Sequence, residues 1–374
     1  MKIQSLYFKN GYLGWEVDRI EFQNLNLLVG LSGAGKSQII SALWHLRGIA
    51  LGKPMNNIEW DIKFSIDENT YEWKGSFTAG SFNSDYKIKT ERIRVSTGEG
   101  IERKHDGLIR IEEPGYDPQT TTRSTTPEGL LFQIYSSYDF IRLIVNGFKM
   151  MNLRDHTHSQ ANIETDFYRL KFRYASISRR LGADINLQEL QNGNYNIAER
   201  LLIAYKKQTN EFNVFTEIFE EVQSIFPEIE EWLIEEQTNK NTEGGHIEYK
   251  IKINGQRRFI PHWNISSGML RTFNIIADLY LSNPETVFLL DEFENSLGHN
   301  CLPNLEELIL EHSIQSQFIM TSHHPDIINS IPKDNWIIIE RTNGTIHNRP
   351  ANGLPFSNST HEQYLILTNN FDRQ

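Results

Sequence analysis

Residues 30–37 constrain the fold more than any other part of the chain. They read Gly-Leu-Ser-Gly-Ala-Gly-Lys-Ser and fit the pattern GxxxxGK[ST] in full. An apolar run over residues 25–29 precedes them, and a helical pattern over residues 38–50 follows. A phosphate chain must be met by converging N–H donors, and glycines let the backbone approach it without side chains in the way. Because a buried strand and a helix flank the segment, a phosphate-binding loop is favoured over a glycine-rich turn without a ligand.

The same segment predicts the groups that would hold a nucleotide and its metal ion. The ammonium of Lys36 is placed to bind the β- and γ-phosphates, and the hydroxyl of Ser37 to ligate Mg²⁺. The helix that begins there directs its N-terminal amides and the positive end of its dipole at the same anion. The predicted nucleotide-binding residues of this loop are Gly30, Ser32, Gly33, Ala34, Gly35, Lys36, Ser37 and Gln38.

A second apolar run, over residues 287–290, ends in Asp291 and Glu292. A buried strand that ends in two carboxylates suits magnesium chemistry, because one carboxylate serves the metal and the other polarises the attacking water. Such a strand end is common by itself, but the phosphate-binding loop favours the catalytic interpretation. We expect Asp291 to bind Mg²⁺, directly or through water, and Glu292 to be the general base.

Two further segments extend the predicted site. Ser266, Ser267 and Gly268 stand at the start of an amphipathic helix, where hydroxyls and amides are able to meet a phosphate. Capping of the helix by serine explains the same residues without any ligand. Another apolar strand, residues 317–321, is followed by a histidine pair, of which His323 is placed to hydrogen-bond a terminal phosphate. A surface histidine pair before a helix is the alternative.

Composition narrows the class of protein. The 374 residues are 39% hydrophobic and 11% aromatic, which is typical of a globular chain with a large core. A single cysteine, Cys301, excludes an internal disulfide framework, and with no leader pattern it predicts a cytoplasmic location. No apolar run reaches bilayer length, so no membrane partner is expected. The net charge of −11 disfavours a surface that is basic throughout, although a local basic groove is compatible with it.

Periodicity predicts how the rest of the chain is organised. Period-two patterns predict strands over residues 1–8, 15–22, 60–66, 71–77 and 86–95, the last three as an antiparallel sheet. Glycine, threonine, proline and charge predict a long loop over residues 97–127. Helical patterns follow over residues 127–151, 163–181 and 195–236, interrupted at Gly182, Gly193 and Pro227, and strand patterns return over residues 246–253 and 258–260.

The order of these motifs resembles that of the ABC-type ATPases of the SMC, RecF and OLD group, over residues 1–50 and 263–341. The likeness is greatest to the ATPase subunit of Septu-type anti-phage systems. The resemblance implies Walker A at residues 30–37, Walker B at residues 287–291, Glu292 as catalytic base and His323 as switch histidine. It also implies a signature at residues 266–268 that closes on the ATP of a second protomer, and a D-loop at residues 294–297. The Q-loop glutamine is not identified by a motif: Gln133 is a candidate, and a surface glutamine is an equal alternative for this residue.

The fold implied by the motifs and the resemblance is α/β. It is an ABC-type P-loop NTPase core with an antiparallel β subdomain and an inserted α-helical subdomain. Residues 1–126 are expected to form the N-terminal part of the ATPase lobe, residues 127–245 the helical insertion, residues 246–349 the rest of the lobe, and residues 350–374 a polar tail. No nuclease domain fits in that tail, so a nuclease is expected on a separate subunit.

The function implied by the resemblance is a switch ATPase that binds ATP and Mg²⁺, hydrolyses ATP, and regulates a separate nuclease or toxin in anti-phage defence. A head-to-tail homodimer or a higher oligomer is the expected assembly. The alternative is a RecF-like ATPase that binds DNA in repair or recombination. It rests on basic residues of a predicted helix, which equally fit a solvated basic face: Arg169, Lys171, Arg173, Arg179 and Arg180.

Overall fold

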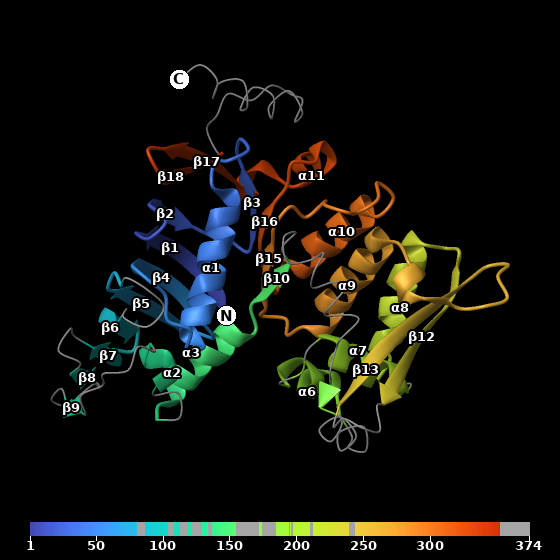
Figure 1. Cartoon of the computed structure of the whole chain (residues 1–374), viewed down its shortest axis with the longest axis horizontal. Coiled ribbons are helices and arrows are strands. Elements are labelled where there is room, and N and C mark those ends of the chain that lie inside the picture. Colours follow the sequence, from blue (N-terminus) through green and yellow to red (C-terminus); the bar gives the residue numbers. More distant parts are fainter. Residues whose placement is uncertain are drawn as a thin grey trace. The chain divides into compact units, whose positions relative to one another are not determined.

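The chain forms two compact units in a computed structural model (Figure 1). Unit 1 comprises Met1–Leu153, Glu285–Phe293 and Ser313–Gln374, and unit 2 comprises Arg154–Pro284 and Glu294–His312. The structure describes residues 1–80, 87–103, 108–112, 119–121, 129–133, 137–154, 172–173, 185–193, 195, 197–209, 212–238 and 244–351.

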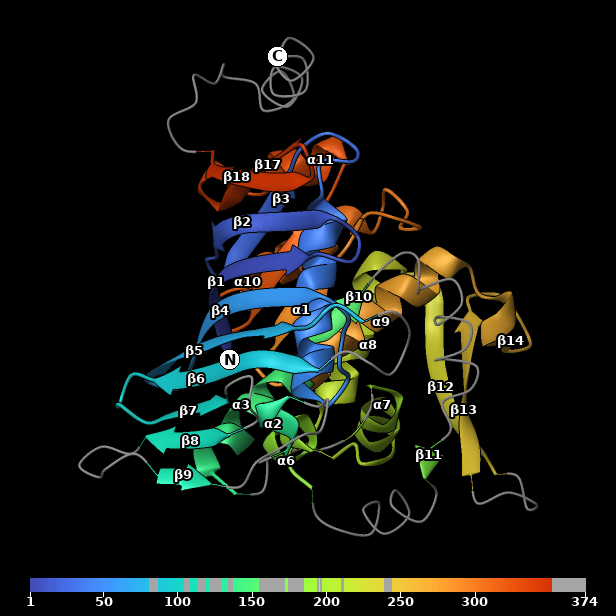
Figure 2. The same ribbon diagram turned by 60° about the vertical axis from the view of Figure 1, so that its left-hand side comes forward.

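A mixed sheet is the framework of unit 1 (Figure 2). Its order is β10-β15-β16-β3-β17-β18-β2-β1-β4-β5-β6-β7-β8-β9. In chain order the strands are β1 (Lys2–Asn10), β2 (Trp15–Glu21), β3 (Leu25–Val29), β4 (Ile58–Ile66), β5 (Asn69–Phe77), β6 (Ile88–Val95), β7 (Gly100–Arg103), β8 (Ile109–Glu112), β9 (Gln119–Thr121), β10 (Asn152–Arg154), β15 (Val287–Leu290), β16 (Gln317–Thr321), β17 (Trp336–Thr342) and β18 (Thr345–Pro350).

Four neighbouring strands of this sheet, β15, β16, β3 and β17, run parallel to one another. Every residue of β3, β15 and β16 is buried, which explains why their sequences are predominantly apolar rather than alternating. The carboxyl ends of parallel strands meet at one edge of a sheet, and in open α/β sheets ligands bind at that edge. The loops after β3, β15 and β16 therefore come together there.

In the order of the sheet, the strands β2-β1-β4-β5-β6-β7-β8-β9 pair antiparallel with their neighbours in this series and form the β subdomain. Three helices contribute to its core: α1 (Lys36–Ala50), α2 (Leu130–Gln133) and α3 (Asp139–Lys149). Phe148 of α3 makes edge contacts with the rings of Phe64 and Trp73 at 5.5 and 5.4 Å. Burial of aromatic side chains on one face of the sheet stabilises this arrangement, at about 1.5–3 kcal/mol for each large side chain.

Unit 2 is built around helix α9 (Ser267–Leu281). Its Phe273 ring lies 4.8 Å from Trp232 and 5.9 Å from Phe226. The other elements are β11 (Phe172–Arg173), α6 (Leu187–Asn192), α7 (Ile197–Lys206), α8 (Val214–Ile225), β12 (Ile229–Thr238), β13 (Gly244–Ile253), β14 (Ile260–Pro261), a short 3₁₀ helix (His262–Asn264) and α10 (Leu302–His312). Among the described helices of both units, none combines the length and the apolar character that crossing a bilayer requires.

The structure corrects two predicted segments. Residues 97–127 contain β7, β8 and β9 instead of one long loop, because Ile101, Ile109 and Ile111 are buried and extend the apolar face of the subdomain. The helical pattern predicted up to residue 236 ends with α8 at the expected break, and β12 instead of a further helix follows Pro227, with Trp232 and Ile234 buried. Proline ends the helix, and the glutamates of β12 had matched the solvent-facing side of a helix.

The predicted helix over residues 163–181 is also wrong in part. Phe172–Arg173 is strand β11, paired antiparallel with β13, and the other residues of that prediction lie outside the described part of the chain. Four of the five basic residues on which the DNA-binding alternative rests also lie outside the described part of the chain. The predicted α/β class is confirmed, with a P-loop core and an antiparallel β subdomain. The predicted boundaries at residues 126, 245 and 349 stay a prediction.

Candidate functional site

The loop between β3 and α1 has a backbone that only glycine adopts readily. Gly33 and Gly35 have φ values of 83° and 107°, in the left-handed region. A Cβ on Gly35 would also lie 2.5 Å from the Ile346 side chain. A Cβ on Gly30 would lie 2.4 Å from the carbonyl oxygen of Ile339, so β17 passes directly beside the loop. The glycines of the motif are therefore explained by backbone conformation and by close packing.

Helix α1 begins immediately after this loop, with Gly35 as its N-cap. Glycine has no side chain to cap the first turn, and no side-chain cap hydrogen bond is present at this end of the helix. Lys36 is buried, with 6% of its surface exposed. Its Nζ donates hydrogen bonds to the carbonyl oxygens of Gly30 and Leu31 at 2.8 and 3.0 Å. The ammonium thus lies against the loop, where it would meet an anion bound to the helix N-terminus.

The end of β15 lies beside this loop. The Ser37 hydroxyl donates to Oδ1 of Asp291 at 3.1 Å, and the Thr321 hydroxyl donates to the same oxygen at 2.7 Å. Asp291 is 8% exposed and Thr321 is 1% exposed. The arrangement follows from strand order, because β16 lies between β3 and β15 and all three end at this edge. Two predicted metal ligands from distant parts of the sequence are therefore in hydrogen-bond contact.

The chain turns sharply after Asp291. Glu292 has a φ of 46°, a left-handed conformation that costs a residue with a Cβ about 1–2 kcal/mol. Its N–H donates to the Thr321 hydroxyl at 2.7 Å, and the next N–H, of Phe293, donates to the Thr321 carbonyl at 3.0 Å. Phe293 is fully buried. Two hydrogen bonds and one buried ring therefore hold the predicted base in a strained turn.

The donor set at this edge of the sheet fits Mg²⁺ and a phosphate chain. Ser37 offers a hydroxyl and Asp291 a carboxylate, and magnesium prefers hard oxygen ligands of this kind. The helix amides and Lys36 offer positive potential to phosphates at the same place. The roles of all these residues in binding stay a prediction.

The predicted signature lies in unit 2, at the start of α9. Ser266 is the N-cap, and its Oγ accepts a hydrogen bond from the Met269 N–H at 3.3 Å. The capping alternative is therefore present in the structure, and a role toward ATP stays a prediction. Ser266 and Ser267 are both exposed. A Cβ on Gly268 would lie 2.6 Å from the carbonyl oxygen of Ser296, which has a φ of 63°. The predicted signature and D-loop therefore touch within unit 2.

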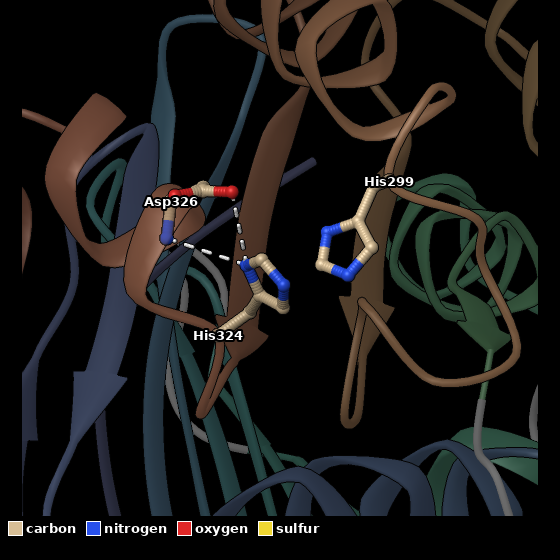
Figure 3. A group of neighbouring side chains, drawn as sticks. All are labelled: His299, His324 and Asp326. Atoms are coloured by element: carbon tan, nitrogen blue, oxygen red, sulfur yellow. Dashed lines mark hydrogen bonds and ion pairs between the residues drawn. The ribbon is translucent and has the colours of Figure 1, made fainter.

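The two histidines after β16 differ in their surroundings. His323 is exposed, as a group that meets a ligand must be. His324 is half-buried and caps α11 (Pro325–Ser330), because its Nδ1 accepts from the Asp326 N–H at 3.3 Å (Figure 3). The same nitrogen lies 3.7 Å from the Asp326 carboxylate. His299, also drawn in Figure 3, is an exposed residue of unit 2. The switch role of His323 stays a prediction.

The Q-loop candidate, Gln133, does not lie at the phosphate-binding loop. It belongs to α2, next to Phe132, whose ring would lie 2.7 Å from a Cβ on Gly52. Gly52 follows the C-terminal end of α1, which is 15 residues long, so the loop is about 20 Å away at the other end. The side-chain oxygen of Gln133 accepts from Arg103 at 3.2 Å. Gln133 therefore contributes to the β subdomain.

Sequence reasoning missed Thr321. It was recognised as the last residue of a buried strand, but its contacts to Asp291 and Glu292 were not foreseen. The available signal was a hydroxyl at the end of a predicted buried strand, since such a group needs a partner when it is buried.

The chain was compared with solved structures, with curated proteins and with protein families. Among solved structures, the chain is similar to an SMC head bound to the C-winged helix domain of ScpA, at 15% identity and a TM-score of 0.49, covering 93% of this chain and 97% of that one. For the SMC head domain from Thermotoga maritima the identity is 14% and the TM-score 0.41, covering 94% of this chain and 99% of that one. For an SMC head domain with a coiled coil and joint from Pyrococcus yayanosii the identity is 14% and the TM-score 0.45, covering 100% of both chains. No curated protein matches the chain.

One family matches residues 25–329, a span that includes the phosphate-binding loop, the end of β15 and the end of β16. Its description is "AAA domain, putative AbiEii toxin, Type IV TA system". Since the match covers most of the chain and contains the P-loop geometry, the chain belongs to this family of AAA-type P-loop ATPases.

Proposed function

We propose that the protein binds and hydrolyses ATP in a Mg²⁺-dependent manner and acts as a dimeric switch. The observation that carries the proposal is the contact between the Ser37 hydroxyl and the Asp291 carboxylate. It lies next to the turn at Glu292, which is stabilised by a hydrogen bond to Thr321. This contact joins the phosphate-binding loop to the strand that supplies the carboxylates. Little covalent chemistry is asked of the protein in phosphoryl transfer, so positioning and charge are the main requirements.

Each residue has a chemical task in this proposal. The α1 amides and Lys36 bind the β- and γ-phosphates, in exchange for the bonds that Lys36 makes to Gly30 and Leu31. Ser37 and Asp291 would hold Mg²⁺, which when bound neutralises charge on the phosphates. The Glu292 carboxylate accepts the proton of the attacking water. His323 is exposed and donates a hydrogen bond to the terminal phosphate.

The proposal includes a second protomer. Ser266, Ser267 and Gly268 offer exposed hydroxyls and the amides of the 15-residue helix α9, all within unit 2. In a head-to-tail dimer this helix end would meet the ATP bound by unit 1 of the partner, as the resemblance to SMC and RecF ATPases implies. Hydrolysis would then require association, and the ATP-bound dimer and the free protomer would be the two states of the switch.

The proposed biological role is the control of a separate nuclease or toxin in anti-phage defence. The support is associational: the resemblance to Septu-type ATPases, and a family description that names a toxin and a toxin–antitoxin system. ATP binding would change the affinity of the dimer for the effector, and the effector would change the affinity for ATP by the same factor.

The experiment is ATP turnover measured against protein concentration, with Lys36→Ala as the inactive control. Specific activity that rises with concentration supports catalysis across a dimer interface. Turnover by wild type equal to that of the Lys36 variant would refute the ATPase proposal. Adding double-stranded DNA at two salt concentrations tests the alternative, because stimulation that weakens steeply with salt would indicate phosphate contacts and a RecF-like role.

A further inference from the structure

Thr321 lies at the centre of the proposed catalytic turn without being one of the groups assigned to ATP or Mg²⁺. It is the last residue of β16, 1% exposed, and its side chain lies between Asp291 and Glu292. Its hydroxyl donates to Asp291 Oδ1 at 2.7 Å and accepts from the Glu292 N–H at 2.7 Å. Its carbonyl oxygen accepts from the Phe293 N–H at 3.0 Å.

These contacts use both properties of a hydroxyl. A hydroxyl has one O–H to donate and lone pairs that accept, so it can bond to a carboxylate and to a backbone N–H at the same time, whereas a methyl group can bond to neither. Removing it would leave the Glu292 N–H without its acceptor in a turn whose φ of 46° already costs free energy. It would also leave Asp291 held by Ser37 without this second donor.

We infer that Thr321 is a positioning residue for ATP hydrolysis. It orients the Asp291 carboxylate toward Ser37 and fixes Glu292 in its left-handed conformation, so that the metal ligand and the base act from one rigid turn. Because β16 runs directly into the loop that carries His323, one strand end sets the position of all three groups. The inference rests on the proposed function and names a residue that the sequence motifs do not include.

The first test uses the nucleotide-free protein. Amide hydrogen exchange of Glu292 and Phe293 is compared in wild type, Thr321→Val, which has the same shape without the hydroxyl, and Thr321→Ser, which keeps it. We expect exchange at Glu292 to be at least tenfold faster in the valine variant and close to wild type in the serine variant. Equal protection in all three proteins would overturn the inference.

The second test separates the metal from the nucleotide. ATP affinity in EDTA should stay within about threefold in Thr321→Val, because Lys36 and the α1 amides are untouched. The Mg²⁺ concentration for half-maximal turnover should rise about 10–100-fold and kcat should fall, as for other partners that orient a metal ligand. Thr321→Ser should restore both values. A serine variant as impaired as the valine variant would overturn the inference, because packing rather than the hydroxyl would then be responsible.

Thr286→Val is the matched control. Thr286 is 2% exposed and immediately precedes β15. The control variant therefore also loses a buried hydroxyl, but at the end of β15 that lies away from Asp291. Thermal unfolding of each variant shows whether the fold is kept. If Thr286→Val reproduced the Mg²⁺ shift, the inference would fail. If wild type hydrolyses ATP and Thr321→Val matches it, the inference alone fails; if wild type shows no Mg²⁺-dependent turnover, the proposed function fails with it.

Discussion

The Ser37 hydroxyl and the Asp291 carboxylate form a hydrogen bond of 3.1 Å across a sequence separation of 254 residues. The separation is large because the β subdomain of unit 1 and the Arg154–Pro284 segment of unit 2 both lie between the phosphate-binding loop and β15 in the sequence. The contact itself needs only the order β15-β16-β3 in a parallel sheet. The two halves of the candidate site are therefore joined by the fold of unit 1 alone, which allows each half to be tested by single substitutions.

Lys36→Ala is expected to weaken nucleotide binding severely. The ammonium is the one positive charge that the motif places against the phosphates, and a hydrogen bond to a charged group contributes about 1.5–3 kcal/mol, or roughly 10–100-fold in affinity. Lys36→Met, which keeps the length of the apolar stem, controls for packing of this buried side chain. Both variants are measured by titration with a fluorescent ATP analogue, and an unaltered affinity would refute the P-loop assignment.

Glu292→Gln is expected to bind ATP with an affinity within about threefold of wild type but to lose about 10²–10⁴-fold in turnover, the contribution of a general base. The amide keeps the shape of the carboxylate, and the backbone bond to Thr321 is unaffected. ATP should therefore trap the variant in the associated state, which size-exclusion chromatography with and without ATP would reveal. Hydrolysis at the original rate would exclude Glu292 as the base.

Ser266 allows helix capping and catalysis to be separated. Ser266→Asp keeps a capping oxygen for the Met269 N–H, so the free energy of unfolding should change by less than about 0.5 kcal/mol, whereas Ser266→Ala should lose about 0.5–2 kcal/mol. Both variants should hydrolyse ATP slowly, because the first lacks a hydroxyl and adds a negative charge, and the second lacks a hydroxyl. Urea unfolding and turnover are compared on the same preparations.

Mixing Ser266→Asp with Lys36→Ala tests whether sites are shared between protomers. In a head-to-tail heterodimer both substitutions fall in one site and the other site is intact. About half of the dimers in an equal mixture are heterodimers, each with one of two sites intact, so about a quarter of wild-type activity should return. If subunits exchange and no activity returns, the signature serves its own protomer and the head-to-tail arrangement is wrong.

The sequence predicted the parts of the fold in which local signals and tertiary structure agree. Residues 25–29 and 287–290 are buried on both faces, so an apolar run was sufficient to identify β3 and β15, and glycine spacing identified the loop. Ser266 identified the start of α9 because a cap is a local feature. These agreements placed Ser37 and Asp291 correctly on their elements.

The sequence did not predict features that depend on distant partners. The charged Arg103 of β7 fitted the predicted polar loop, yet its side chain is only 2% exposed and forms an ion pair with Glu91, whose side chain is 0% exposed. Neither burial is visible before β6 and β7 pair. Thr321 was missed for the same reason, since its partners lie 30 and 29 residues earlier in the chain. Gln133 was only a candidate for the Q-loop beside the alternative of a surface glutamine, and its hydrogen bond with Arg103 lies in the β subdomain instead.

The pair Glu91 and Arg103 gives a prediction about the stability of the β subdomain. Glu91 accepts from Trp73 Nε1 at 2.8 Å and from the Leu130 N–H at 2.7 Å, and burial raises its pKa despite the nearby guanidinium. Arg103→Met would leave this carboxylate buried without a cation, with a loss of about 3–5 kcal/mol in the free energy of unfolding. The double variant Glu91→Gln with Arg103→Met should lose less, because no charge is then stranded. Urea unfolding that ranks the double variant below the single one would contradict this account.

His45 predicts how stability depends on pH. Its ring stacks 6.2 Å from Phe8, its buried Nδ1 has no hydrogen-bond partner among the described residues, and burial lowers its pKa below the ordinary value of 6.5. Between the lowered pKa and 6.5 the unfolded chain binds more protons than the folded chain, so stability rises with pH through this window. The contribution of His45 is therefore complete above pH 6.5 and is lost as the pH falls toward its folded pKa.

The free energy of unfolding from urea titrations between pH 7.5 and 5.0 checks this sign. His45→Gln should be less stable at pH 7.5, because the ring stack with Phe8 is lost, but its stability should fall less steeply toward pH 5.0. Burial lowers the pKa of His312 as well, so part of the pH dependence should remain in the variant. The same substitution at the exposed His299 controls for loss of an imidazole. A slope in His45→Gln equal to that of wild type would show that His45 is not responsible.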